Sequence, residues 1–100
     1  MTLILLIHRP EADTAVEHDM RAAVRDAIWE VADAHWEVGP DVVLAATDLS
    51  PSYLVQHFQR AAARRGYPDP GSLMVVPITP KTAWIGLPPA AEHWVREVLD

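Results

Sequence analysis

"AHWEVGPDVVLAAT", residues 34–47, decides between two folds for this chain. In one interpretation the preceding helix continues to Val38, and a single strand follows the glycine and proline. In the other, His35–Val38 and Val42–Thr47 are the two strands of a hairpin around the turn Gly39-Pro40-Asp41. The first predicts a βαβαβα chain, an α/β flavodoxin-like fold with a parallel sheet. The second predicts the βαββαβ order of an α+β ferredoxin-like domain.

The elements on either side of this stretch are the same in both interpretations. Apolar runs indicate strands, a Thr14-x-x-Glu17 capping box and a three-to-four-residue apolar repeat indicate a long helix, and Ser50-Pro51 starts a second helix that Gly66 ends. Pro77 inside the last run is compatible only with an edge strand or a bulge. The expected elements outside the deciding stretch are strand 2–7, a helix from Thr14 to about Asp33, helix 51–65, strand 73–78 and helix 90–99.

The length and composition indicate one ordinary folded domain, residues 1–100, since half of the residues are hydrophobic. Cysteine is absent, which removes disulfides, thiolate catalysis and thiolate metal sites and fits a cytoplasmic protein. The first residues lack the basic segment and small-residue cleavage site of a signal peptide, and no apolar run is long enough to cross a bilayer. A net charge of -6 disfavours nucleic acid and anionic membranes as partners. No cofactor is expected.

The strands are apolar at consecutive positions, as is usual when both faces of a sheet are buried. This pattern alone favours the parallel sheet. In a ferredoxin-like domain the two long helices cover one face only, so the other face needs a different cover. A second copy of the chain, joined by a two-fold axis, would supply it.

Three stretches of the chain form a recognisable set: Trp36 followed by Thr47-Asp48-Leu49-Ser50, the strand Val75–Thr79, and Ala83-Trp84-Ile85-Gly86-Leu87 leading to Trp94–Leu99. They resemble motifs of the small bacterial proteins called SinR-like, which are ferredoxin-like relatives of the CRISPR-associated adaptation nuclease. The resemblance implies the ferredoxin-like fold, a two-fold dimer, and a short extra strand or arm at 82–87 that Trp84 anchors on its own sheet or on the partner's. It places Trp84, Ile85, Leu87 and Trp36 at the interface.

One departure from these relatives bears on catalysis. The nuclease relatives carry an aspartate at the end of the first strand, where paired subunits can hold a divalent metal. Here that position reads Ile7-His8-Arg9-Pro10, with no carboxylate before Glu11. Metal-dependent nuclease activity is therefore not supported, and we expect no catalytic residue and no metal site.

Two pairs of residues are candidates for ligand contacts. His8 and Arg9 follow the expected first strand, where they could bind an acidic ligand; the structural alternative is an exposed loop histidine and an arginine paired with Glu11 or Asp13. Arg60 and Arg64 share a helix face and could contact a nucleic-acid backbone, but they also suit the helix dipole. The structural alternatives are favoured for both pairs.

The sequence therefore predicts a non-catalytic dimeric protein that acts through protein association, with a further protein partner. The alternative is a nucleic-acid-binding or RNA-processing protein of toxin–antitoxin or CRISPR-related type.

Overall fold

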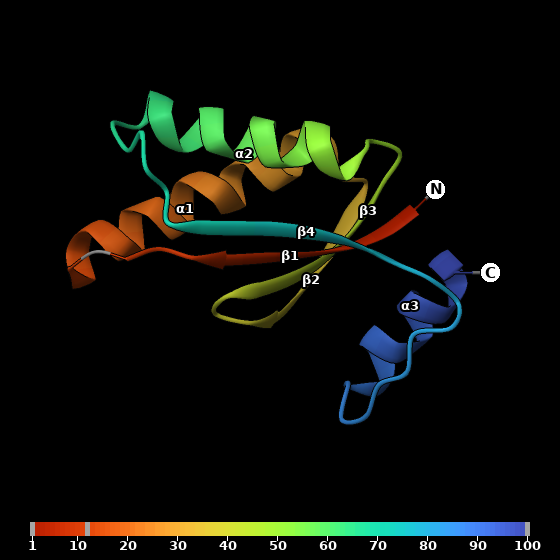
Figure 1. Ribbon diagram of the computed structural model, residues 1–100. Coiled ribbons are helices and arrows are strands. Elements are labelled where there is room, and N and C mark those ends of the chain that lie inside the picture. The colour runs from red at the N-terminus through yellow and green to blue at the C-terminus, as the bar shows by residue number, and fades with distance from the viewer. Residues whose placement is uncertain (1, 12, 100) are drawn as a thin grey trace.

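The computed structural model describes residues 2–11 and 13–99. Their elements follow the order βαββαβα, and four strands form one antiparallel sheet with the strand order β2-β3-β1-β4. This is the ferredoxin-like α+β fold, with an added C-terminal helix (Figure 1). The flavodoxin-like alternative is wrong, because neighbouring strands are all antiparallel. The elements are β1 Thr2–Arg9, α1 Thr14–Val31, β2 Ala34–Gly39, β3 Val42–Thr47, α2 Pro51–Arg64, β4 Ser72–Ile78 and α3 Pro89–Leu99.

The hairpin that decides the fold is present. α1 ends at Val31, and β2 pairs with β3 so that Trp36 lies opposite Leu44. The register shifts between Glu37 and Gly39, which marks a bulge just before the turn at Pro40. The prediction of two strands around Gly39-Pro40-Asp41 is confirmed.

The helix ends follow local capping chemistry. Asp13 caps α1, since its side chain accepts hydrogen bonds from two main-chain N–H groups of the first turn. The capping residue therefore precedes Thr14, which is already helical, and the prediction of a Thr14 cap is corrected. Ser50 caps α2 and Pro51 is its first residue, as predicted.

The first face of the sheet is covered by α1 and α2, which lie on the same side of it in Figure 1. Ile4 and Leu6 of β1 pack there against Val24 and Ile28 of α1 and Phe58 of α2. Leu54, Phe58, Ala61 and Ala62 form the buried side of α2, whereas Tyr53 is exposed to solvent.

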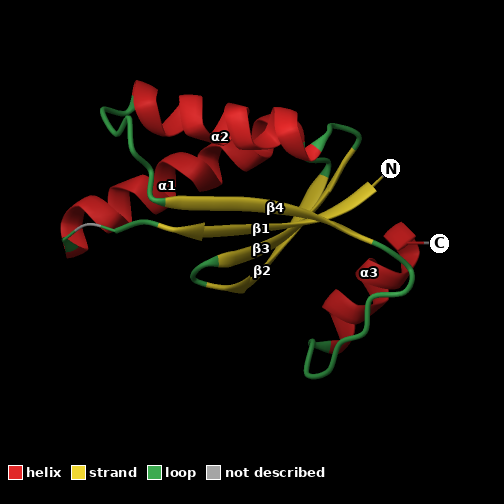
Figure 2. Ribbon diagram, in the orientation of Figure 1, coloured by secondary structure: helices red, strands yellow, loops and turns green. Residues whose placement is uncertain are grey.

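Among the described residues, α3 and the arm that leads to it are the segments that cover the second face. Figure 2 shows α3 on the opposite side of the sheet from the long helices and near one end of the strands. Residues 79–88 form this arm, which contains turns but no strand pairing. The expected extra segment is thus an arm rather than a fifth strand. Within the described residues, no helix is long and apolar enough to cross a membrane.

Candidate association surface

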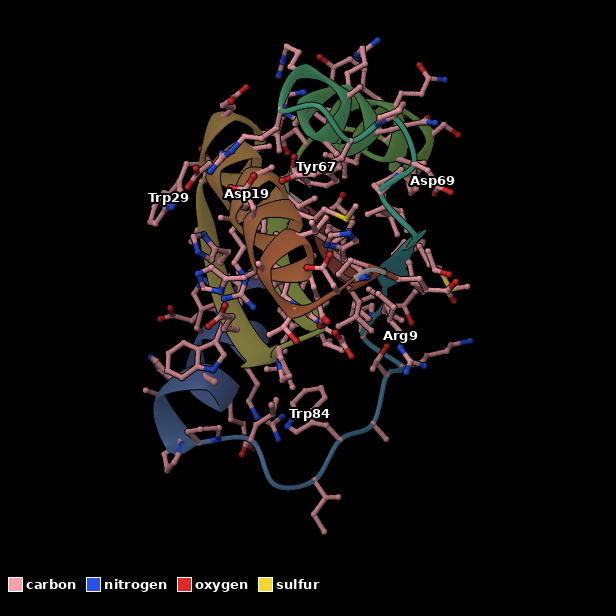
Figure 3. The ribbon with its side chains drawn as sticks, turned by 90° about the vertical axis from the view of Figure 1, so that its left-hand side faces the viewer. Arg9, Asp19, Trp29, Tyr67, Asp69 and Trp84 are labelled. Carbon is pink, nitrogen blue, oxygen red and sulfur yellow. The ribbon has the colours of Figure 1, made fainter. Side chains whose placement is uncertain are left out.

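Three of the four residues expected at an interface gather on the second face. Trp36, Trp84 and Leu87 pack against a buried cluster of Leu3, Leu44 and Val95. These residues come from β2, the arm, β1, β3 and α3, so the arm closes onto its own sheet (Figure 3). The fourth, Ile85, is set apart at a turn of the arm and is 99% exposed.

Trp84 is held from its outer side as well. The guanidinium carbon of Arg96 on α3 lies 5.2 Å from the centroid of the Trp84 ring, a cation–π contact. Arg96 is oriented by Glu92 one turn earlier, whose carboxylate accepts a hydrogen bond of 2.9 Å. The arm and α3 therefore form one unit, and of the two anchors predicted for Trp84 the structure shows its own sheet.

The other end of the second face is not covered by α3. Ile7 lies opposite Val42 on one neighbouring strand and opposite Met74 on the other. Met74 is 57% exposed, and Val38 at the end of β2 is 47% exposed. An apolar surface thus extends from the α3 cluster across the sheet toward the hairpin turn.

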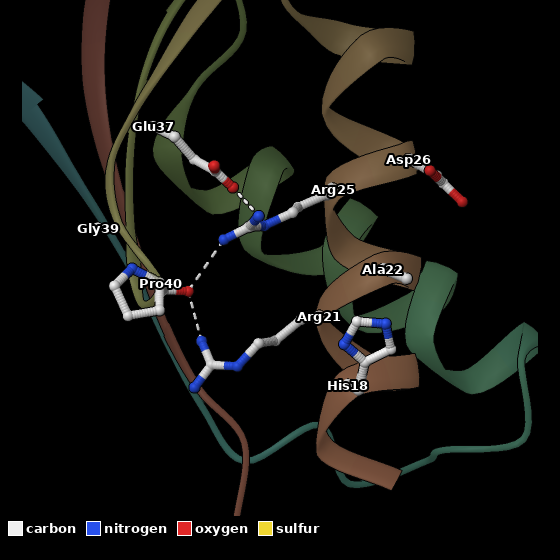
Figure 4. A pocket seen from close by; sticks show the side chains of 8 residues that line it. All are labelled: His18, Arg21, Ala22, Arg25, Asp26, Glu37, Gly39 and Pro40. Carbon is white, nitrogen blue, oxygen red and sulfur yellow. Dashed lines mark hydrogen bonds and ion pairs between the residues drawn. The ribbon is translucent and has the colours of Figure 1, made fainter. Parts of the chain in front are cut away.

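A groove of about 660 Å³ lies between α1 and the β2–β3 hairpin. Arg21 and Arg25, one turn apart on α1, reach across it and both donate to the Pro40 carbonyl oxygen (Figure 4). Arg21 also pairs with Asp41, and Arg25 pairs with Glu37. These guanidinium groups already have carboxylate partners, so they hold the hairpin against α1 rather than form a site for an anionic ligand.

The contacts that these two arginines make with the hairpin were not predicted from the sequence. They belong to the charged face of the predicted amphipathic helix, where an exposed arginine is unremarkable. The signal that could have found them is their four-residue spacing, which places both on one side of the helix. The hairpin carboxylates that they meet are far away in sequence, so their pairing follows only from the fold.

His8 and Arg9 do not form a common ligand site. Both belong to β1 itself rather than to a loop after it. His8 is buried, its Nε2 lies 2.8 Å from the Pro70 carbonyl oxygen, and burial lowers the pKa of its imidazole. Arg9 points outward and pairs with Asp41 at 3.8 Å, not with an acid of the following loop. Arg9 is therefore paired with an acid, but with Asp41 and not with Glu11 or Asp13 as predicted. The prediction that His8 is an exposed loop histidine is wrong, because it is buried within β1.

The basic cluster at the end of α2 is partly neutralised. Arg60 and Arg64 are exposed, as expected for side chains at this helix surface. The third member, Arg65, makes ion pairs of 3.1 Å to Asp19 and 3.3 Å to Asp26 of α1. Arg65 therefore contributes to holding the two long helices together.

No group of three or more histidine, cysteine, aspartate or glutamate side chains in residues 2–11 and 13–99 is arranged to hold a metal ion. Comparison with protein-family models, with curated proteins and with solved structures found no match to this chain. The resemblance to the SinR-like proteins stays a prediction.

Proposed function

We propose that this protein is a non-catalytic homodimer that acts through protein association. The observation that carries the proposal is the incomplete cover of the second face: α3 and the arm cover one end, while Met74 and Val38 are exposed at the other. Exposed contiguous apolar side chains typically mark a contact with another protein. The predicted interface residues Trp36, Trp84 and Leu87 belong to the same face.

No observation on the described surface favours the nucleic-acid alternative. The chain carries a net charge of -6, and two carboxylates neutralise Arg65 in its basic cluster. His8 lies in the interior, away from the exposed Arg60 and Arg64 on α2, so the candidate ligand contacts do not combine into one binding surface. Association with protein is the function that remains best supported.

The test is the mass of the purified protein in solution. Sedimentation equilibrium from about 1 to about 100 µM covers the range in which weak protein dimers dissociate. We expect twice the chain mass of 11.1 kDa at the upper end of this range. A mass of 11.1 kDa at every concentration would contradict the proposal.

A pair of variants separates specific association from general stickiness. Trp36→Ala should weaken the dimer, because Trp36 lies on an edge strand and on the incompletely covered face. Tyr53→Ala removes an exposed aromatic from α2 on the opposite side of the molecule and should leave the mass unchanged. Equal effects of the two substitutions would argue against a defined interface.

A further inference from the structure

The edge strand β2 directs specific main-chain groups outward. The Ala46 carbonyl of β3 accepts a hydrogen bond of 3.0 Å from Asp33 N–H, so the main-chain groups of Ala46 point toward β2. Because residues of a strand alternate in direction, Ala34 and Trp36, opposite Ala46 and Leu44, turn their N–H and C=O groups inward to β3. The groups of His35 and Glu37 therefore point outward, away from the sheet.

His35 also carries an unsatisfied side-chain atom. Its Nδ1 is buried and has no hydrogen-bond partner in the described part of the chain. The ring packs edge-on against Trp29 of α1, with 4.4 Å between ring centroids, and Trp29 itself is 70% exposed. A buried polar atom without a partner is costly, and an exposed tryptophan beside it indicates a surface that becomes covered.

We propose that a second copy of this chain adds its β2 antiparallel to the first, around a two-fold axis at Trp36. This inference rests on the proposed function, since it names the β2 edge, with Trp36 on the second face, as the surface that joins the homodimer; Met74 on the opposite edge strand stays outside this contact. The axis places His35 opposite Glu37 of the partner subunit and Glu37 opposite His35 of the partner subunit. Both members of each pair direct their main-chain groups outward, so each pair exchanges both of its N–H···O bonds.

The same register makes the side chains complementary. His35 and Glu37 point to the same face of the sheet, since they are two residues apart on one strand. The Glu37 carboxylate of the partner subunit thus lies across the strand from the ring whose Nδ1 lacks a partner, and the two-fold axis repeats this contact. On the other face, Trp36 meets Trp36 of the partner subunit, which joins the two apolar clusters around Leu44.

The opposite edge of the sheet is closed to such pairing. The His8 N–H donates to the Asp41 carbonyl at 2.9 Å, so the even-numbered residues of β1 face β3 and the odd-numbered ones face β4. Leu3 is opposite Ile78, which places the main-chain groups of Ile78 inward and the neighbouring Pro77 outward. A proline at this outward position has no N–H group to donate to a partner strand.

The β2 edge carries a weaker protection of its own. The bulge between Glu37 and Gly39 ends regular pairing near the turn. It limits the contact to the short stretch centred on Trp36, where His35 and Glu37 lie. A short, symmetric contact suits a second copy of this chain better than a long foreign strand.

The test uses two charge variants of the full chain, His35→Glu and Glu37→Lys. Alone, His35→Glu places two carboxylates opposite each other, and Glu37→Lys places a lysine opposite His35 of the partner subunit. Each variant thus loses the His35–Glu37 pair at both symmetric positions. Each should dimerise at least about tenfold more weakly than the original chain. An equimolar mixture places the introduced glutamate opposite the introduced lysine and leaves the other His35–Glu37 pair as in the original chain, so dimer should reappear in sedimentation velocity. Gln56→Glu, on the exposed surface of α2, is the matched control and should change nothing.

The outcomes separate this inference from the proposed function. A monomeric original chain overturns both. A dimer that neither variant weakens, or two weakened variants that do not recover on mixing, overturns the β2 pairing and leaves the homodimer to another surface. If His35→Glu lowers the melting temperature, Arg25→Ala serves as the reference for Glu37→Lys, because both variants break the Arg25–Glu37 pair that fastens the hairpin to α1 and only Glu37→Lys changes the cross-strand position. The decision then rests on Glu37→Lys. Undiminished dimer in that variant then overturns the pairing.

Discussion

Replacing Trp84 with alanine should destabilise the protein by about 2–3 kcal/mol. Truncation of a fully buried aromatic side chain to alanine costs roughly 3–5 kcal/mol. Trp84 is half-buried against the cluster of Leu3, Leu44 and Val95. We therefore expect the loss of its packing to cost about 2 kcal/mol. The cation–π contact with Arg96 at 5.2 Å adds about 0.5 kcal/mol, since the arginine is largely exposed. For a domain of this size the melting temperature should fall by roughly 10–15 °C.

Urea unfolding followed by far-ultraviolet circular dichroism measures this change through the midpoint, with the slope unchanged. Ile85→Ala is the matched control: the neighbouring side chain is 99% exposed, so its loss should shift stability by less than about 0.5 kcal/mol. Measurement at two protein concentrations separates the arm's packing from any dimer contribution, which depends on concentration. Equal stability of the Trp84→Ala and Ile85→Ala variants would refute the assignment of Trp84 as the anchor of the arm.

Two further predictions concern a backbone position and a buried titratable group. Gly71→Ala should destabilise the protein strongly, because Gly71 has φ +83° and an added Cβ would meet the Arg9 carbonyl oxygen. Gly66→Ala, at φ +100° but in open space, should cost only about 1 kcal/mol of backbone strain. Equal melting temperatures of the two variants would contradict this prediction. Burial lowers the folded-state pKa of His8 below its usual 6.5, so the unfolded chain takes up the proton first, and stability should fall as the pH drops below about 6.5. In His8→Gln this part of the pH dependence of urea midpoints should disappear, and an unchanged pH profile would show that His8 does not cause it.

Most of the fold could be predicted from local signals. Ser50-Pro51 placed the second helix, and Pro77 indicated an edge strand, which β4 is. The deciding stretch 34–47 was harder, because a glycine after an apolar segment ends a helix as readily as it begins a turn. Strand pairing between His35–Val38 and Val42–Thr47 is a contact between neighbours in sequence, so turn chemistry alone could support it.

The surroundings of His8 could not be predicted in the same way. Ile4, Leu6 and His8 alternate onto one face of β1, so a strand extended by two residues would have placed the histidine inside. The Pro70 carbonyl that it contacts lies 62 residues away in a loop, and no sequence pattern connects the two. The packing of α3 at one end of the second face could not be predicted in detail either, because it depends on the arm that carries Trp84.

The two edges of this sheet bear directly on the proposed β2 pairing. A four-stranded antiparallel sheet leaves two edges, and each presents alternate unpaired N–H and C=O groups. On β4, Pro77 occupies an outward position and closes the edge. On β2 the outward positions are His35 and Glu37, a donor ring and a carboxylate, with the exposed Trp29 beside them. If β2 pairs with its own copy as proposed, the two-fold axis places the Glu37 carboxylate of the partner subunit across the strand from the His35 ring at both symmetric positions, whereas Pro77 leaves β4 without a comparable pairing.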